Sequence, residues 1–457
     1  MSSEALFQRF VEQSPITVML RGILENVFRP QAIDEIFAAS ARRQRPGELL
    51  FSSVVDLLAL VVLRERRSMN HAYTHAQEQF EVSLTSVYNK LNGTETTVCR
   101  ELVRRPAQTL VEVVDVLRGL TKRKPKLVGY RTRILDGNHL TSTEHRLEVL
   151  RRTRSGPLPG QVLAVLDPDR MLIVDLFPWE DAHSQERVIL PQVLETAQYR
   201  DLWIADRNFC TTGSLFGLAA RRASFIIRQH ASTLTWDKET KQKKIGRCDS
   251  GVIYEQTLTL TRGEETLLVR RITIKLDKPT ESGETEIHLL TNLSRRAANA
   301  FKVAELYLTR WTIENAFQEI EQALRSEINT LGYPGAALLG FSIAVVTYNV
   351  LSVTKWAVEA EQGETIQREQ LSGYYLAAVV SADYGGMMIA LPDEEWTARF
   401  AEFTPRQLAN QLRVCARRVK PHQFRKTSRG PKKPRPPRSR GNVYHHVSTA
   451  RLLAAQK

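Results

Sequence analysis

Strand and helix signals alternate through the middle of the chain, and this alternation constrains the fold more than any other feature. Strand patterns cover residues 131–140, 160–179, 202–209 and 224–230, and helical patterns cover 185–198 and 211–223. The run 160–179 contains DPDR, a turn sequence, so it predicts a hairpin. The order strand, hairpin, helix, strand, helix, strand predicts an α/β domain with a mixed sheet.

Different patterns flank this segment. Residues 1–122 have helical apolar spacing and few strand formers. From about 230 to 293 apolar and polar residues alternate between Gly, Asp and Lys clusters, which predicts a β-rich insertion. A mostly helical segment extends to about 412. The chain of 457 residues exceeds what one hydrophobic core usually supports, so we expect several structural units.

The net charge of +14 is concentrated near the C-terminal end of the sequence. Twelve Lys or Arg residues, with Lys432, Lys433 and Arg435 among them, lie between positions 413 and 440, where Asp and Glu are absent. Such a segment predicts an extended arm that binds a polyanion, with nucleic acid as the expected partner.

Cysteines and apolar runs bear on the compartment. The four cysteines are widely scattered without a CxxC motif, which indicates neither a disulfide framework nor a zinc site and fits a reducing compartment. The N-terminal residues lack the basic start and apolar run of a signal peptide. Polar residues interrupt the apolar stretch 336–358, which predicts a buried helix rather than a membrane span. We therefore expect a cytoplasmic protein with no membrane partner.

Residues 306–322 (LYLTRWTIENAFQEIEQ) predict one amphipathic helix with an unusual polar strip. At about 100° per residue, four side chains share a strip about 60° wide beside the apolar stripe: Tyr307, Arg310, Glu314 and Glu321. The strip is either a solvated flank with an Arg310–Glu314 pair or one wall of a site.

Other carboxylates favour the second interpretation. Asp136 and Asp206 each end a short apolar strand, so they should project together at the strand ends of an α/β sheet, where ligands bind. Glu314 could add a third carboxylate from the side. Individually, Asp136 could form a turn ahead of Gly137, and Asp206 could pair with Arg207 or cap a helix. Three carboxylates without a His or Cys cluster suit Mg²⁺ or Mn²⁺, and two such ions can act on a phosphodiester.

The motifs ILDGN, IADRNF and YLTRWTIENAFQEIE, in this order around a β-rich insertion, resemble the DDE transposases of bacterial insertion sequences. The resemblance spans roughly residues 125–350 and is strongest to the IS-four family, which has a Tyr-Arg-Glu-Lys signature on one helix. It implies a ribonuclease-H-like catalytic domain with Asp136, Asp206 and Glu314 as the metal-binding triad. Tyr307 and Arg310 would contact DNA phosphates.

The resemblance also bears on the aromatic residues and on one departure. Trp236 is a candidate for stacking on a flipped base by its location in the insertion, whereas we expect Trp311 to pack in the core. Glu321 stands where the family usually has Lys. A carboxylate cannot bind a phosphate as Lys does, so this contact is lost, replaced by another role or supplied by Arg325.

These observations together predict a segment organisation and an activity. The predicted segments are a helical DNA-binding domain (1–122), a ribonuclease-H-like catalytic domain (123–350) interrupted by the β-rich insertion (230–293), a helical C-terminal region (351–412) and a basic tail (413–457). We expect a bacterial, nucleoid-associated cut-and-paste transposase. It would bind terminal inverted repeats as a homodimer, hydrolyse phosphodiesters with two Mg²⁺ ions and join 3′-hydroxyls to double-stranded target DNA.

Alternative activities are a ribonuclease-H-like structure-specific nuclease and a catalytically inactive DNA-binding derivative. A carbohydrate hydrolase that uses two carboxylates fits the basic tail poorly.

Overall fold

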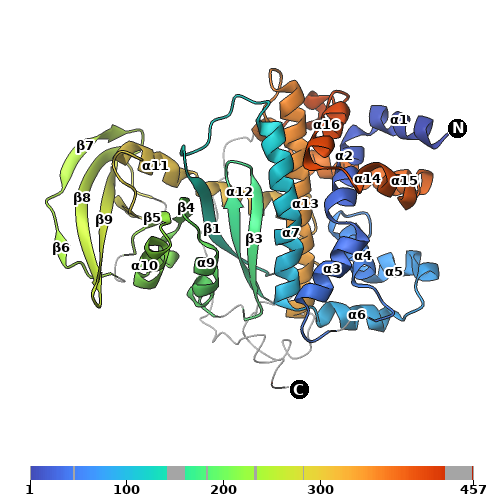
Figure 1. Ribbon diagram of the computed structural model, residues 1–457, viewed down its shortest axis with the longest axis horizontal. Coiled ribbons are helices and arrows are strands. Elements are labelled where there is room, and N and C mark those ends of the chain that lie inside the picture. Colours follow the sequence, from blue (N-terminus) through green and yellow to red (C-terminus); the bar gives the residue numbers. More distant parts are fainter. Residues whose placement is uncertain are drawn as a thin grey trace.

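The computed structural model describes residues 2–44, 47–141, 160–181, 184–230, 234–280, 282–427 and 455. Its elements lie in three neighbouring regions, with helices on the right of Figure 1, a mixed sheet with flanking helices in the middle and a β-rich region on the left. The protein is therefore of the mixed α/β class that the sequence predicted, and its central part is consistent with a ribonuclease-H-like fold.

One sheet contains the ten strands of the described residues, in the order β3-β2-β1-β4-β5-β10-β9-β8-β6, with β7 paired to β8. The strands are β1 (Arg131–His139), β2 (Gln161–Asp167), β3 (Leu172–Trp179), β4 (Asp201–Ala205), β5 (Ser224–Arg228), β6 (Lys238–Glu239), β7 (Lys243–Cys248), β8 (Gly251–Arg262), β9 (Glu265–Leu276) and β10 (Glu286–Thr291). Parallel pairing joins β1, β4 and β5, and the other pairs are antiparallel. The sheet is mixed, and β2 and β3 form the predicted hairpin.

The β-rich insertion continues the central sheet. Its last strand, β10, pairs with β5, so β6 to β9 extend the same hydrogen-bonded sheet away from α7 and α13 (Figure 1). The segment predicted over 230–293 is therefore joined to the central sheet by backbone hydrogen bonds.

The two faces of the central strands contact different groups of helices. Along β1, Ile134 belongs to one apolar core and Leu135 to another, as alternating strand residues must. The first core joins the sheet to α7 (Thr96–Arg118), α11 (Ala300–Leu308), α12 (Trp311–Ala323) and α13 (Pro334–Gln362). The second joins it to α9 (Leu190–Thr196) and α10 (Thr212–Ala220).

Helix α13 is the centre of the larger core. It packs along α7 and β3, and its residues from Pro334 to Glu359 are all buried. It is long and apolar enough to cross a membrane, but the apolar window lies wholly inside the fold. Buried polar side chains on it have partners: Asn349, for example, accepts from the N–H of Ile173 at 2.8 Å and donates to its carbonyl at 2.9 Å. The sequence prediction of a buried helix at this position is confirmed.

The N-terminal helices pack against helices from the other end of the chain. They are α1 (Ser3–Gln13), α2 (Pro15–Val27), α3 (Pro30–Ser40), α4 (Phe51–Val62), α5 (Met69–His75) and α6 (Leu84–Asn92), and the later ones are α14 (Gly373–Ala390), α15 (Asp393–Phe400) and α16 (Pro405–Ala416). Helix α2 contacts α14, α15 and α16. Phe400 lies so close to Gly22 that a Cβ there would be 2.4 Å from the ring. Helices distant in sequence therefore share one core.

Short 3₁₀ turns join several of these elements. They are η1 (Gln77–Gln79), η2 (Glu186–Ile189), η3 (Arg207–Phe209), η4 (Arg368–Gln370) and η5 (Pro421–Phe424). Two of them, η2 and η3, contact each other beside the ends of β1 and β4.

The single helix predicted over residues 306–322 is two helices, so this prediction is wrong. Helix α11 ends at Leu308 and α12 begins at Trp311. Across the break, the N–H groups of Thr309 and Arg310 donate three residues back, and the Thr309 hydroxyl donates to the Leu306 carbonyl at 2.6 Å. This local bonding competes with the regular helical ladder. As a result, Arg310 lies at the junction and Glu314 in the first turn of α12.

Candidate active site

Asp136 and Asp206 occupy equivalent positions on adjacent parallel strands. The register pairs Leu135 of β1 with Ala205 of β4, and each aspartate is the next residue along its strand. Leu135 and Ala205 face the core formed with α9 and α10. Residues one step further alternate to the opposite face, which is the face that α12 covers from β1.

Arg310 connects two of the predicted carboxylates. Its Nη1 donates to Oδ2 of Asp136 at 3.0 Å, and its Nη2 is 2.7 Å from Oε1 of Glu314. The guanidinium is buried, whereas Glu314 keeps 38% of its side chain exposed. The cation of Arg310 therefore lies between a strand-end carboxylate and a carboxylate of the first turn of α12.

Tyr307 completes this cluster from α11. Its ring is buried, and its hydroxyl oxygen accepts a hydrogen bond from Arg310. Burial raises the pKa of Tyr307, so its hydroxyl stays protonated at neutral pH. Tyr307, Arg310 and Glu314, which the sequence placed on one strip, lie together although a helix break separates the first from the last.

The electrostatics of Asp136 depend on its neighbours. Burial raises the pKa of Asp136 to about 7, and the negative charges of Asp206 and Glu314 add to this effect. Arg310 and the N–H of Gly137, which donates to Oδ1 at 3.0 Å, oppose it. The three carboxylates therefore interact, and a buried carboxylate with so high a pKa gains from a nearby cation.

The donor set matches the chemistry of a hard divalent cation. Among the residues that the structure describes, no three His, Cys, Asp or Glu side chains lie close enough together to hold a metal ion. Arg310 instead provides the positive charge between Asp136 and Glu314. Carboxylate oxygens are the ligands that Mg²⁺ or Mn²⁺ prefers in proteins. Asp136, Asp206 and Glu314 are thus the residues that could hold one, with the guanidinium as the present counter-ion.

Asp206 also has a structural role. Its Oδ1 accepts from the N–H of Asn208 at 2.7 Å and so caps the short 3₁₀ helix η3. Its other neighbour in sequence, Arg207, pairs with Glu284 at 3.2 Å rather than with Asp206. The cap uses one oxygen of the carboxylate, which fixes the direction of the other.

A fourth carboxylate, that of Glu186, was not predicted from the sequence. This residue begins η2, and its Oε1 lies 3.8 Å from Nε2 of His139. Burial raises its pKa, and the charge of Asp206 adds to the rise. A Cβ at position 137 would lie 2.1 Å from Oε1, so a larger residue there would make the Glu186 carboxylate shift. The one signal in the sequence is this glycine within a strand, because such a residue often marks a close approach.

A cavity of about 510 Å³ opens beside Glu314 on the outer surface of α12. Trp311 and Glu321 line it together with Asn138 at the end of β1. Trp311 is 55% exposed and lies 5.0 Å below the Arg310 guanidinium, so the prediction that it packs in the core is wrong. Glu321 faces the same cavity as Glu314, and its position places negative charge where the resemblance had suggested Lys.

Arg325 and Trp236, which were also predicted for the site, contact groups other than these carboxylates. Arg325 donates to the carbonyls of Arg66 and Arg67 at 3.2 and 2.6 Å, which ties the end of α12 to the segment after α4. Trp236 is half-buried and packs against the core of α9 and α10. Lys432, Lys433 and Arg435 lie outside the described residues.

The central segment resembles a known family of domains. Residues 130–349 match the transposase DDE domain. The match covers just under half of the chain and includes Asp136, Asp206 and Glu314. It begins at the start of β1 and ends within α13, so the DDE segment contains the sheet, the β-rich insertion and the helix that carries Glu314.

A curated protein also resembles this chain. "Putative transposase y4zB" of Sinorhizobium fredii (strain NBRC 101917 / NGR234) is 30% identical over 155 residues. The aligned part covers 33% of this chain and 42% of that protein, so the match spans about two fifths of the relative's length. The central segment is therefore similar to a transposase DDE domain, and part of the chain is similar to a protein named as a putative transposase.

Proposed function

We propose that this chain is a cut-and-paste transposase of the IS-four type. It binds the terminal inverted repeats of an insertion sequence as a homodimer in the bacterial cytoplasm, in association with the nucleoid. It then cuts the ends and joins their 3′-hydroxyls to double-stranded target DNA. One observation carries the proposal: in a segment that matches the DDE domain, Arg310 lies between Asp136 and Glu314, and the charge of Asp206 acts on Asp136.

In the proposed reaction, Asp136, Asp206 and Glu314 hold two Mg²⁺ ions, for which Mn²⁺ can substitute. Such ions supply an activated water or 3′-hydroxyl and stabilise the leaving oxygen of a phosphodiester. Arg310 exchanges a carboxylate partner for a phosphate oxygen, to which its planar guanidinium can donate two bonds. Tyr307 keeps that guanidinium in place through its neutral hydroxyl, whose oxygen accepts a hydrogen bond from Arg310.

Other parts of the chain provide DNA affinity in this proposal. The helical residues 1–122 recognise the ends, and the basic tail, with Lys432, Lys433 and Arg435, neutralises phosphates without reading sequence. The internal bonds of Arg325 favour a structural role for that residue, because its guanidinium already contacts two carbonyl groups.

The site can be tested with the ends of the element that encodes the chain. Wild type, Asp136→Asn and Asp277→Asn are incubated with labelled end DNA, with Mg²⁺ or with EDTA. Asp277 is an acidic residue of the same DDE segment that pairs with Arg247 at the surface, so it is a matched control. We expect Mg²⁺-dependent cleavage by wild type and Asp277→Asn and a loss of at least about a hundredfold in Asp136→Asn. Equal cleavage by all three would refute the site.

Strand transfer separates a transposase from a structure-specific nuclease with the same site. Pre-cut ends with free 3′-hydroxyls are mixed with a supercoiled plasmid and Mg²⁺. We expect joined products in which the end is covalently attached to the plasmid. Cleavage without any joining would instead support the nuclease, and the absence of both with intact end binding would support an inactive DNA-binding derivative.

A further inference from the structure

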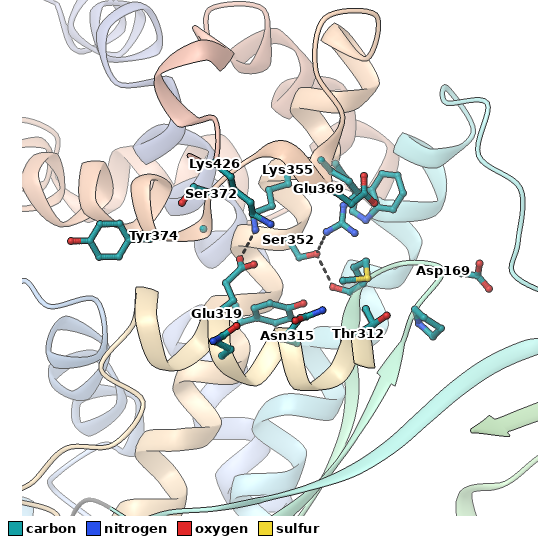
Figure 2. A pocket seen from close by; sticks show the side chains of 18 of the residues that line it. Asp169, Thr312, Asn315, Glu319, Ser352, Lys355, Glu369, Ser372, Tyr374 and Lys426 are labelled. Atoms are coloured by element: carbon teal, nitrogen blue, oxygen red, sulfur yellow. Dashed lines mark hydrogen bonds and ion pairs between the residues drawn. The ribbon is translucent and has the colours of Figure 1, made fainter. Parts of the chain in front are cut away.

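A second, larger cavity lies on the other side of α12. Its volume is about 880 Å³, and its walls come from α12, α13, the start of α14, the segment after α7 and the residues just before position 428. Figure 2 shows Thr312, Asn315 and Glu319 of α12 facing Ser352 and Lys355 of α13 across it. Asn315 and Gln318 line both this cavity and the one beside Glu314, so the two cavities adjoin along α12.

The walls of this cavity are predominantly positive. Three carboxylates line it, namely Asp169, Glu319 and Glu369, and seven cationic side chains line it: Arg118, Arg123, Lys124, Lys126, Lys355, Arg368 and Lys426. Three of the cations, Lys124, Lys126 and Lys426, are exposed and form no ion pair within the described part of the chain. The chain continues from Lys426 into the basic residues of the tail. The cavity therefore attracts anions and is adjacent in sequence to a further source of positive charge.

Two buried cations form its inner wall. Arg368 is 5% exposed, donates from Nη2 to the Ser352 hydroxyl at 3.0 Å and lies 4.7 Å from the ring of Trp356. Its Nε has no hydrogen-bond partner among the residues that the structure describes. Lys355, which is 4% exposed, is paired with Glu319. A buried N–H without an acceptor costs free energy, which an anionic ligand oxygen at this wall would recover.

The Nε of Arg118 is a second donor of this kind. It is buried and has no acceptor in the described residues, and the nearest carboxylate oxygen to its guanidinium is that of Asp169, at 3.9 Å. Two guanidinium groups of the same cavity therefore each keep an unused donor. Arginine is the side chain best suited to phosphate oxygens, because its donors form a planar fork.

Size and polarity select the kind of ligand. A volume of about 880 Å³ lies in the range of small-ligand sites, about 300–1,000 Å³, and is far too small for a duplex. Tyr374, half of whose surface is exposed, offers an aromatic face at the rim (Figure 2). Cations along a groove with an exposed aromatic are typical of single-strand binding, in which phosphates meet the cations and a base stacks on the ring.

We propose that this cavity binds the phosphates of an unpaired nucleic-acid strand that passes over α12 from the active site. The strand crosses at Asn315 and Gln318, which border both cavities, and its backbone contacts Lys126, Lys426 and Arg368. The inference rests on the proposed function, because it needs DNA at Glu314. It adds a second contact region that would retain a separated strand after cutting.

Single-strand binding in EDTA tests the inference without cleavage. The affinity of a short fluorescein-labelled oligothymidine is measured by anisotropy over a range of salt for wild type, Lys126→Glu, Lys426→Glu and Lys122→Glu. Lys122 is an exposed lysine of the same segment that does not line the cavity, and each variant changes the charge equally. Each lost phosphate contact should lower the slope of log K against log salt by about 0.7, which is about fivefold in affinity per tenfold change in salt.

We expect that loss in Lys126→Glu and Lys426→Glu and near-wild-type behaviour in Lys122→Glu. Equal losses of affinity in all three lysine variants would mean that only the net charge of the protein matters, which would overturn the inference. An unchanged affinity in Lys126→Glu and Lys426→Glu would also overturn it. Thymidine 5′-monophosphate and inorganic phosphate are added as competitors. If either competitor bound tightly and the oligonucleotide bound no more tightly than that competitor, the cavity would be a site for a free anion. This result would overturn the proposal that it binds a nucleic-acid strand.

The result stays independent of the proposed catalytic function. Asp277→Asn should bind the oligonucleotide like wild type, since Asp277 pairs with Arg247 at the surface and does not line this cavity. If no variant or wild type cleaved DNA but the two lysine variants lost strand binding, the proposed catalytic function would fail and the cavity assignment would stand. Cross-linking of a 4-thiothymidine strand to the peptide that contains Tyr374 gives a second readout, and its absence would argue against the path over α12.

Discussion

Replacing Arg310 with Ala tests whether the guanidinium is the counter-ion of the proposed site. The substitution removes the charge that lies 3.0 Å from Asp136 and 2.7 Å from Glu314. Removing one partner of a buried ion pair costs about 3–5 kcal/mol. Solvent reduces this cost here, because Glu314 is 38% exposed, and Asp136 can take up a proton since its pKa is about 7. We therefore expect the free energy of unfolding to fall by about 2 kcal/mol in EDTA.

The response to Mg²⁺ distinguishes this role from simple structural support. The guanidinium competes with any other cation between Asp136 and Glu314, so its removal should tighten Mg²⁺ binding. A tenfold tighter Kd adds about 1.4 kcal/mol of stabilisation when the ion is in excess. Arg310→Ala should consequently recover most of its lost stability in Mg²⁺, whereas wild type should gain less.

The assay is urea unfolding followed by tryptophan fluorescence, in EDTA and in excess Mg²⁺. Arg100→Ala is the matched control, because Arg100 makes two hydrogen bonds of 2.9 Å to the buried Asp175 outside the site. It should lose stability that Mg²⁺ does not restore. If Mg²⁺ stabilised wild type and Arg310→Ala to the same extent, or restored Arg100→Ala equally, the reasoning would be refuted.

Three further substitutions test other parts of the molecule. Glu186→Gln should slow Mg²⁺-dependent end cleavage by about tenfold, as loss of a supporting carboxylate does. In single-turnover assays it should also shift the Mg²⁺ concentration that gives half-maximal rate. An unchanged Mg²⁺ dependence would show that Glu186 is not part of the site. Trp311→Ala should weaken single-strand binding, measured by anisotropy, by about 1–3 kcal/mol, because its exposed ring is available for stacking. Trp236→Ala should lower only the free energy of unfolding, because Trp236 packs against the core. The opposite pattern would support the prediction from the sequence that Trp236 stacks on a base and Trp311 packs in the core. Burial raises the pKa of Glu255, but hydrogen bonds from two arginines, including Arg270, outweigh it and lower the pKa below 4.5. A carboxyl group whose pKa is lower in the folded state stabilises the fold at pH values above its unfolded pKa, and this stabilisation is lost as pH falls. The difference in free energy of unfolding between wild type and Glu255→Gln should therefore be largest at neutral pH and should disappear in acid. A difference that does not depend on pH would contradict the ion pair.

The positions of the two strand-end aspartates could be predicted because they depend on short-range patterns. An apolar strand alternates its faces, and parallel neighbours end at the same edge of the sheet, so Asp136 and Asp206 had to be near each other. The pairing of Arg310 with Glu314 also followed from their spacing of four residues, although the helix itself begins only at Trp311. The hairpin of β2 and β3 and the buried helix α13 also have strong local signals, namely a turn sequence and a long apolar run.

Features that depend on tertiary contacts could not be predicted. The break between α11 and α12 has no proline or glycine, and it arises from side-chain and backbone bonds of Thr309 and Arg310. The exposure of Trp311 depends on which face of α12 packs against the rest of the fold. Helical spacing alone does not determine that face. Glu186 approaches the site through η2, a short turn whose sequence looked like the start of a helix.

Arg325 shows the same limit for a charged side chain. Its position about one turn after Glu321 allowed a phosphate contact, but the carbonyls that it binds belong to residues more than 250 positions earlier in the sequence. The spacing of residues along one helix gives no information about contacts with segments so distant in the sequence.

The central position of α13 has a consequence for synthesis of the protein. On the ribosome, α7 and β3 emerge well before residues 334–362. The apolar surfaces that they pack against α13 therefore cannot be buried by it until most of the chain has been translated. Glu314 also precedes that helix, and α12 packs on α13 as well as on β1. A premature stop or frameshift before residue 334 would therefore leave a nascent product that cannot bury these surfaces, and chaperones and proteases would encounter it before DNA does.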